Sequence, residues 1–467
     1  MEENNISALA DRLNIALVSM PSQNYWHPAP SIVFLKGVLN REGITSTCFD
    51  LNHAFLTEFG DDAVHWCETG DNYDSRYTKF VKDYIEKFEG YNWIGASVFT
   101  LNSQIFTRLF LKLVKERFPD VKVVLGGAGT TNNHSDLTTL SMSFAQEMID
   151  QGLADYEIKG EGDRALPALL RGESYVFPQM DDLSNMPIPD YGDIDFSLYS
   201  KPTLIVTGSR GCVRQCTFCD VHANWKKYKY RPGEEVANEI IHQYYTYGID
   251  RFHFSDSLVN GSLKEFRVFC RTLAQANLPI EWRGQFIFRS GMTDEDWDNL
   301  AASGCKGLWI GIESGSDAVR WHMKKKFSNK DMYESVHALG KRKIDMLYLL
   351  IVGYPTETEE YYEETLELLR QSVPYKNYVE VRCNIAMLMP DTEIYEDKEL
   401  WHGDVQLWRS WTKDGELTYR VRYERWKKLQ DLVIELGLKG DKRIKQQEKL
   451  ILRKLEKENE RILVNNI

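Results

Sequence analysis

The sequence Cys212-Val-Arg-Gln-Cys216-Thr-Phe-Cys219 carries the strongest chemical signal in this chain of 467 residues. It follows the apolar run 204–206, which predicts a buried strand, and the short loop 207–211. Three cysteines at C-x3-C-x2-C spacing can ligate three irons of a cubane iron–sulfur cluster and leave the fourth iron without a protein ligand. An open coordination position makes a metal centre reactive rather than purely structural.

A zinc site is the alternative interpretation of the same cysteines. His222 follows Cys219 at a spacing that extends the pattern to C-x3-C-x2-C-x2-H. Four ligands of this kind close a tetrahedral zinc site. Cysteine spacing alone therefore leaves both kinds of metal centre open.

The order of a strand, a loop with C-x3-C-x2-C, and an aromatic residue, Phe218, before the last cysteine resembles the radical SAM superfamily. The resemblance implies that Cys212, Cys216 and Cys219 hold a [4Fe–4S] cluster and that Phe218 lies at the cofactor site. It also implies that the open iron binds S-adenosylmethionine (SAM), which one electron from the cluster cleaves to a 5′-deoxyadenosyl radical. The three cysteines would then carry the catalytic electron chemistry.

The composition predicts a soluble protein in a reducing compartment. Hydrophobic residues make up 43% and charged residues 27% of the chain, and no run of 18 apolar residues occurs. The first residues, Met1-Glu-Glu-Asn-Asn5, lack the features of a secretory signal, so we expect a cytoplasmic protein without a membrane span. A net charge of −12 disfavours nucleic acid as the main partner. The cysteines outside the triplet are then expected to be buried thiols: Cys48, Cys67, Cys270, Cys305 and Cys383.

The N-terminal third alternates strands and helices. Apolar runs predict strands at 14–20, 44–51, 93–99, 121–125 and 154–158, and helical spacing predicts helices near 31–42, 104–118 and 141–151. Such alternation with short turns is typical of a parallel, doubly wound (Rossmann-like) α/β sheet. Ligands bind beyond the carboxyl ends of the strands in these sheets.

A proline-rich acidic stretch, residues 176–200, predicts a linker before a second alternating region. Six strands and five crossover helices are too few for a closed eight-stranded barrel and fit a partial (β/α)6 barrel. We therefore expect an α/β domain at 13–175, the barrel at 201–390 and a helical C-terminal region at 391–467. The strands are predicted at 204–207, 251–255, 281–285, 307–312, 345–351 and 379–386, and the helices near 232–247, 263–275, 293–302, 330–342 and 359–371.

Gly311-Ile-Glu313-Ser-Gly315 ends the fourth of these strands and resembles the strand-4 signature of radical SAM enzymes with an N-terminal cobalamin domain. The resemblance implies that Gly311, Glu313, Arg289 and Asp256 bind SAM, with Arg289 on its carboxylate and Asp256 on its amino group. Two features depart from the family pattern. The turn 353–356 reads Gly-Tyr-Pro-Thr instead of the commoner Gly-Leu-Pro-Gly, and Ser-Asp-Ser at 255–257 replaces an acidic pair.

The N-terminal region also resembles the cobalamin-binding domain of this subfamily, through Gly126-Gly127, Ala154-Asp-Tyr156 and Gly160-Glu-Gly-Asp163. No D-x-H-x-x-G motif occurs, and His53 has the wrong spacing, so no lower cobalt ligand is identified. The residues expected to contact the cobalamin tail are Ser97, Thr100, Gly126 and Gly127.

These resemblances predict a cobalamin-dependent radical SAM enzyme that transfers a methyl group to an unactivated carbon or phosphorus of a small molecule or peptide. A flavodoxin- or ferredoxin-type electron donor is implied. One alternative is a non-methylating radical rearrangement or cyclisation, with or without cobalamin. An alternative of another class is a non-catalytic iron–sulfur or zinc module.

Overall fold

The computed structural model describes residues 13–21, 26–131, 143–389, 392–403, 411–413 and 415–465. The chain divides into two compact units. The first comprises Met1–Asp181, Asn185–Ile205 and Tyr245–Ile249, and the second comprises Asp182–Ser184, Val206–Tyr244 and Asp250–Ile467.

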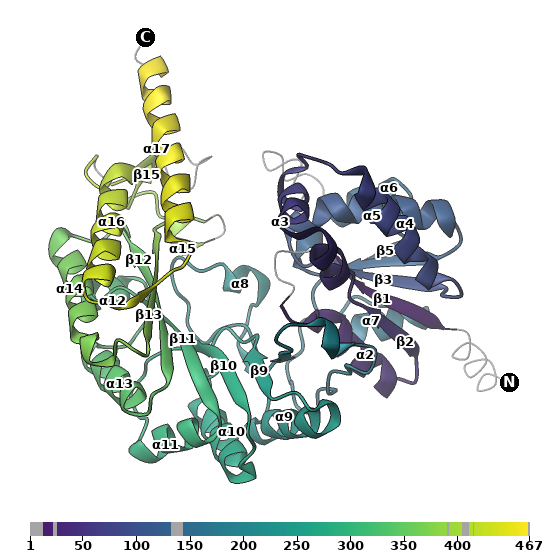
Figure 1. Ribbon diagram of the computed structural model, residues 1–467, viewed down its shortest axis with the longest axis horizontal. Helices are drawn as coiled ribbons and strands as arrows, with labels where there is room; N and C mark the ends of the chain where they lie inside the picture. The colour runs from purple at the N-terminus through teal and green to yellow at the C-terminus, as the bar shows by residue number, and fades with distance from the viewer. Residues whose placement is uncertain are drawn as a thin grey trace. The chain divides into compact units, whose positions relative to one another are not determined.

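The first unit is built on a five-stranded sheet with the order β2-β1-β3-β4-β5. All its pairings are parallel, as the alternating sequence predicts. Figure 1 shows α4, α5 and α6 on one face of this sheet and α2 and α7 on the other. The elements are β1 (Asn14–Ser19), α2 (Pro30–Arg41), β2 (Thr45–Phe49), α3 (Leu51–Thr69), α4 (Ser75–Ile85), β3 (Trp93–Ser97), α5 (Gln104–Arg117), β4 (Lys122–Gly126), α6 (Phe144–Asp150), β5 (Tyr156–Ile158) and α7 (Gly162–Leu170).

Aromatic side chains from α3, α4 and α5 form one side of this unit's core. The sequence between residues 53 and 90 shows no clear periodicity, yet it folds into the two helices α3 and α4. Phe55 is fully buried and packs edge-on against Tyr77 and Phe106 and at a tilt against Phe59, at ring centroid distances of 4.6–5.3 Å. Such offset aromatic contacts stabilise beyond the area they bury and hold the helices over the sheet.

Much of the acidic stretch 176–200 packs on the first unit. The Asp193 carboxylate pairs with the ammonium of Lys36 in α2 at 2.6 Å. The Tyr199 hydroxyl donates to Asp50 at 2.7 Å. These bonds hold residues 185–205, which precede the cysteine loop, against the first unit.

The second unit contains most of a seven-stranded sheet with the order β16-β13-β12-β11-β10-β9-β6. Figure 1 shows α9, α10, α11, α13 and α14 along its outer side, as in an open barrel. The strands are β6 (Leu204–Val206), β9 (Arg251–Phe254), β10 (Glu281–Phe286), β11 (Cys305–Glu313), β12 (Asp345–Val352), β13 (Val379–Ile385) and β16 (Lys439–Gly440). The helices are α8 (Val221–Asn224), α9 (Gly233–Tyr247), α10 (Leu263–Ala276), α11 (Asp294–Ala302), α12 (Asp317–His322), α13 (Asn329–Lys341), α14 (Glu359–Gln371), α15 (Glu393–Glu396), α16 (Tyr419–Glu435) and α17 (Ile444–Asn465).

The six predicted barrel strands and five predicted helices are all present within a few residues of their expected bounds. The short strand β16 was not predicted; it pairs with β13 and brings the C-terminal region into the barrel sheet. The α/β fold class with two parallel sheets is therefore confirmed. Within the described residues, no helix is both long and apolar enough to cross a bilayer.

Candidate functional site

The loop that carries Cys212, Cys216 and Cys219 follows β6 at the carboxyl end of the barrel sheet, where ligands bind in such folds. All three thiols are free and partly exposed, whereas the other five cysteines are buried. Burial raises the pKa of the Cys216 thiol to about 11 and shifts the other two in the same direction. The charges of Cys219, Glu313 and Cys212 act in the same direction on the pKa of Cys216, and the charge of Lys325 opposes them.

Three thiols and one histidine of the cysteine loop are the candidate metal ligands. Among the described residues, no three His, Cys, Asp or Glu side chains converge closely enough to hold one metal ion. A cubane carries its irons at separate corners, so each cysteine needs to reach only its own iron. His222 Nε2 lies 2.6 Å from the Arg214 carbonyl oxygen, to which it donates, and this nitrogen is therefore not available to a metal. Three cysteines, with no fourth ligand supplied by His222 Nε2, fit a cubane with one open iron.

A buried ion pair lies beside the thiols. Lys325 Nζ is 3.0 Å from Glu313 Oε1, and the two residues are 7% and 8% exposed. The ammonium also lies 5.9 Å from the centroid of the Phe218 ring, inside the cysteine loop. Burial by itself lowers the pKa of Lys325, but the charges of Glu313, Cys216 and Cys212 outweigh it and raise the pKa. Lys325 in turn favours the thiolate forms that iron requires.

The backbone at the end of β11 is shaped to place this pair. The register with β12 shifts between Gly311 and Glu313, and Glu313 has a left-handed φ of 65°. A bulge of this kind redirects a side chain, here that of Glu313. The surrounding contacts compensate for the strain of its left-handed backbone. A Cβ at Gly311 would lie 2.7 Å from Glu313 Oε1 and 2.9 Å from Lys325 Nζ. A side chain at position 311 would therefore displace the Lys325–Glu313 ion pair.

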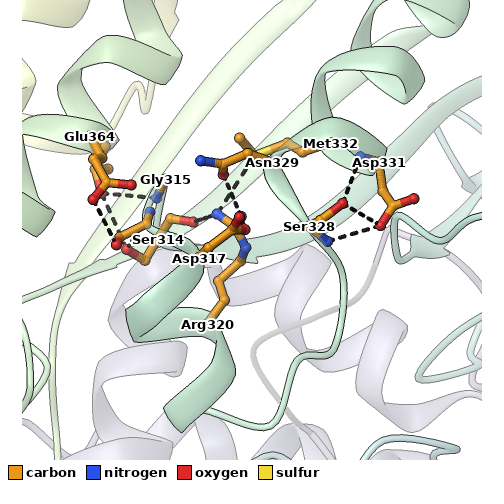
Figure 2. A network of polar contacts seen from close by, with 11 residues as sticks. Ser314, Gly315, Asp317, Arg320, Ser328, Asn329, Asp331, Met332 and Glu364 are labelled. Atoms are coloured by element: carbon orange, nitrogen blue, oxygen red, sulfur yellow. Dashed lines mark hydrogen bonds and ion pairs between the residues drawn. The ribbon is translucent and has the colours of Figure 1, made fainter.

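The buried side chain of Arg320, in α12, fixes the turn after β11. Figure 2 shows its guanidinium between Ser314, Asp317 and Asn329. Arg320 is fully buried and its cation stacks 4.7 Å from the Phe327 ring centroid. These contacts tie both ends of the segment that carries Lys325, so the position of that lysine is determined by the fold.

Asp256 lies just after β9 and is bonded to the start of the cysteine loop. Its carboxylate accepts hydrogen bonds from the Gly208 backbone N–H at 2.8 Å and from the Ser209 hydroxyl. Burial raises the pKa of Asp256 to about 7, although both donors and Arg231 act to lower it. The carboxylate therefore supports the loop in this structure, and its contact with the SAM amino group stays a prediction.

Arg214, in the cysteine loop, and Arg289 lie near each other, and no carboxylate among the described residues forms an ion pair with either. Arg289 Nη1 donates to the carbonyl oxygens of Asn260 and Gly261, each at 2.9 Å. The buried Arg214 Nε has no hydrogen-bond partner in the part of the chain that the structure describes. Burial and the nearby Arg289 charge lower the pKa of Arg214. Two adjacent cations of this kind fit an anionic group such as a carboxylate.

In the first unit, the residues predicted to contact cobalamin lie at the carboxyl ends of β3 and β4. The Ser97 and Ser31 hydroxyls are 2.7 Å apart, and the Thr100 and Ser103 hydroxyls are 3.4 Å apart. These hydroxyls are thus paired within the unit.

The adjacent glycines differ from each other. Gly127 has φ 104°, and a Cβ there would lie 2.4 Å from the Val98 carbonyl oxygen, so backbone packing requires this glycine. A Cβ at Gly126 would meet only the Ile158 carbonyl oxygen, at 3.9 Å. The backbone at Gly126 is therefore open to the close approach of a ligand.

Comparison with known proteins identifies the domain that holds this site. Residues 206–369 match the model of the radical SAM superfamily, and the chain therefore carries a radical SAM domain. An anaerobic magnesium-protoporphyrin IX monomethyl ester cyclase from Synechocystis sp. is 23% identical over 309 residues, which cover 60% of this chain and 59% of the cyclase. A cytidylyl-2-hydroxyethylphosphonate methyltransferase from Streptomyces wedmorensis is 33% identical over 122 residues, or 25% of this chain and 22% of that protein. The chain thus spans well under two thirds of these relatives.

Two solved structures share the fold over most of the chain. The radical SAM methyltransferase TsrM from Kitasatospora setae, with cobalamin and a [4Fe–4S] cluster bound, superposes with a TM-score of 0.60 at 17% identity, covering 82% of this chain and 76% of TsrM. The cobalamin-dependent radical SAM enzyme OxsB, with aqua-cobalamin bound, gives a TM-score of 0.58 at 15% identity, covering 85% of this chain and 57% of OxsB. The expected resemblance to cobalamin-domain radical SAM enzymes is therefore confirmed at the level of the fold.

Sequence reasoning alone missed part of the site. Lys325 and Arg214 were not predicted as site residues. Arg214 lies inside the cysteine motif itself, between Cys212 and Cys216, and that placement of a cation is a signal visible in the sequence. The pairing of Lys325 with Glu313 carries no sequence signal, since it depends on the turn held by Arg320.

Proposed function

We propose that this protein is a cobalamin-dependent radical SAM enzyme that transfers a methyl group to an unactivated carbon or phosphorus of a small molecule or peptide. The observation that carries the proposal is the cysteine loop with the buried Lys325–Glu313 pair beside it, within a radical SAM domain. The shared fold with TsrM and OxsB, each solved with cobalamin, supports a cobalamin role for the first unit.

The residues present fit the cofactors in distinct ways. Cys212, Cys216 and Cys219 would hold a [4Fe–4S] cluster, which when bound supplies the electron that cleaves SAM. Arg289, joined by Arg214, would pair with the SAM carboxylate, because Arg214 Nε has no hydrogen-bond partner within the described residues and the two cations lie near each other. Asp256 would hold the loop that carries the cysteines and lie near the amino group.

Glu313 has one oxygen on Lys325 and would offer the other to a ribose hydroxyl or an ammonium group. In the first unit, the open backbone at Gly126 would approach the cobalamin tail, with Gly127, Ser97 and Thr100 shaping the surrounding turn. A flavodoxin- or ferredoxin-type protein would supply electrons to the cluster.

A radical cyclisation or rearrangement without methyl transfer is the second candidate. The similarity to a cyclase over 60% of this chain favours it, since that similarity covers more of the chain than the methyltransferase match does. Both candidates use the same cysteines and the same SAM site. They differ in the products formed from SAM.

The products of SAM distinguish the two candidates. The full chain, purified anaerobically with hydroxocobalamin, would be incubated with SAM, a reductant and a small-molecule extract, and its products measured by mass spectrometry. Methyl transfer predicts both 5′-deoxyadenosine and S-adenosylhomocysteine, because a methyl donor leaves the latter behind. 5′-Deoxyadenosine alone would support the cyclisation, and neither product, with no iron bound, would contradict the radical SAM proposal.

A further inference from the structure

A network of buried polar side chains contacts the cysteine loop between its second and third cysteines, at Thr217. The Thr217 and Tyr354 hydroxyl oxygens are 2.7 Å apart, and the two residues are 4% and 1% exposed. His322 Nδ1 lies 3.0 Å from the same Tyr354 hydroxyl. A buried hydroxyl that loses its partner leaves a costly unsatisfied group, so this network specifies one position of the loop.

The backbone of Thr217 is held as firmly as its side chain. Its N–H donates to the Met323 carbonyl oxygen at 3.3 Å, and the Ile394 N–H donates to its carbonyl oxygen at 2.9 Å. Three segments far apart in the sequence therefore meet at one residue: the end of α12, the start of α15 and the turn after β12. None of these bonds involves a cysteine.

Tyr354 is itself held in a rigid turn. Gly353 has φ 73° and its N–H donates to Glu357 Oε1 at 2.7 Å, and the same oxygen accepts from Arg425 Nη1 at 2.9 Å. A Cβ at Gly353 would lie 2.2 Å from Cγ of Arg422, so the turn packs directly on α16. The tyrosine thus reaches the loop from a fixed support.

We propose that Tyr354 is a positioning residue that acts through Thr217, with His322 as its second partner, to keep Cys216 and Cys219 at the separation that a bound cluster requires. The role toward the cluster rests on the proposed function, whereas the order imposed on the loop does not. This role explains why the turn reads Gly-Tyr-Pro-Thr rather than Gly-Leu-Pro-Gly, because a leucine has no hydroxyl to bond with Thr217.

The test compares two buried tyrosines whose hydroxyls have different hydrogen-bond partners. Tyr354→Phe removes the hydroxyl on Thr217. Tyr348→Phe, in the same strand region, removes an equally buried hydroxyl whose partner, Ser372 Oγ at 3.2 Å, lies outside the cysteine loop. Two readouts apply: amide hydrogen exchange of residues 212–220 in the iron-free full chain, and the rate at which iron passes from the reconstituted protein to a chelator.

We expect Tyr354→Phe to speed both exchange and iron loss by roughly 5-fold, the effect of one net hydrogen bond, and Tyr348→Phe to leave both unchanged. Thr217→Val is expected to match Tyr354→Phe, Thr217→Ser to restore the wild-type rates, and the double variant Y354F/T217V to be no worse than either single variant.

Equal effects of the two tyrosine variants, or additive effects of Y354F and T217V, would overturn the proposal. The exchange measurement needs no cluster. A wild-type chain that fails to bind iron would therefore count against the proposed function, while the exchange data would still decide the role of Tyr354 in ordering the loop.

Discussion

The two parallel sheets of this protein end in different ways. At the carboxyl ends of the seven-stranded sheet, charged side chains such as Asp256 and Glu313 are buried and bonded to the cysteine loop or to a cation beside it. At the corresponding ends of the five-stranded sheet, serines, threonines and glycines bond or pack against one another. We propose that the first arrangement holds a metal cluster and that the second leaves backbone for a ligand to contact. The two proposed sites can therefore be disturbed separately.

The largest expected effect is loss of the iron centre without loss of cobalamin binding, caused by substitution of one cysteine of the loop. Cys216→Ala should abolish iron binding and SAM cleavage, because two cysteines cannot hold a cubane with one open iron. Cobalt binding by the first unit should persist. Iron content by inductively coupled plasma mass spectrometry and 5′-deoxyadenosine formation measure the effect. Cys270→Ala, at a fully enclosed thiol in α10, is the matched control and should lower stability while it retains iron.

Asp256→Asn should change how stability depends on pH. The pKa of Asp256 is about 7 in the folded protein, against 3.8 for an ordinary aspartate. As pH rises between these values, the unfolded chain ionises this carboxyl while the folded protein keeps it protonated, and the free energy of unfolding falls. The wild type should lose stability relative to Asp256→Asn between about pH 4 and pH 7, by on the order of a few kcal/mol, with no further change above that window. Urea unfolding midpoints at intervals across this range measure the difference, and a constant offset would contradict it.

Gly127→Ala should damage only the first unit. Its left-handed φ and the 2.4 Å approach of the Val98 carbonyl oxygen predict a loss of about 2 kcal/mol and lower cobalt retention, with iron unchanged. Gly126→Ala tests the ligand itself, because its Cβ meets no protein atom closer than 3.9 Å. It should leave the thermal unfolding midpoint unchanged and weaken cobalamin binding. Full cobalamin affinity in Gly126→Ala would remove that glycine from the site.

The smallest expected effect is on the electronics of the cysteine loop. Lys325→Met removes a cation beside the thiols and should make the cluster harder to reduce, whereas Glu313→Gln removes an anion and should make it easier. Shifts of opposite sign, on the order of tens of millivolts, are expected in EPR-monitored potentiometry. Lys324→Met is the control, since Lys324 is exposed and paired with Glu393, where solvent screens its charge. Shifts of the same sign in both variants would indicate structural damage instead.

Much of the fold followed from local patterns, and the reason is physical. The helices α10, α13 and α14 begin at Ser or Thr caps and repeat apolar residues at helical spacing, so their sequences specify them without tertiary help. The strand β16 was missed because two residues carry no periodicity. Its place comes from pairing with β13, a contact made across the barrel sequence.

The candidate site was predictable only where a residue carries its own chemistry. The cysteine spacing and the glutamate at the end of β11 were visible in the sequence. The glycine requirement at Gly127 arises from a neighbouring loop, and the position of Lys325 arises from the buried Arg320 contacts. Long-range contacts of this kind are set by packing, which sequence spacing does not encode.

The measurement that tests the central claim most directly is metal counting on the full chain, purified anaerobically with hydroxocobalamin supplied. Wild-type protein would be compared with the triple variant C212A/C216A/C219A. The account predicts about four irons and about one cobalt per chain in the wild type, and no iron but undiminished cobalt in the triple variant. One zinc per chain in place of iron, lost in the triple variant, would contradict it.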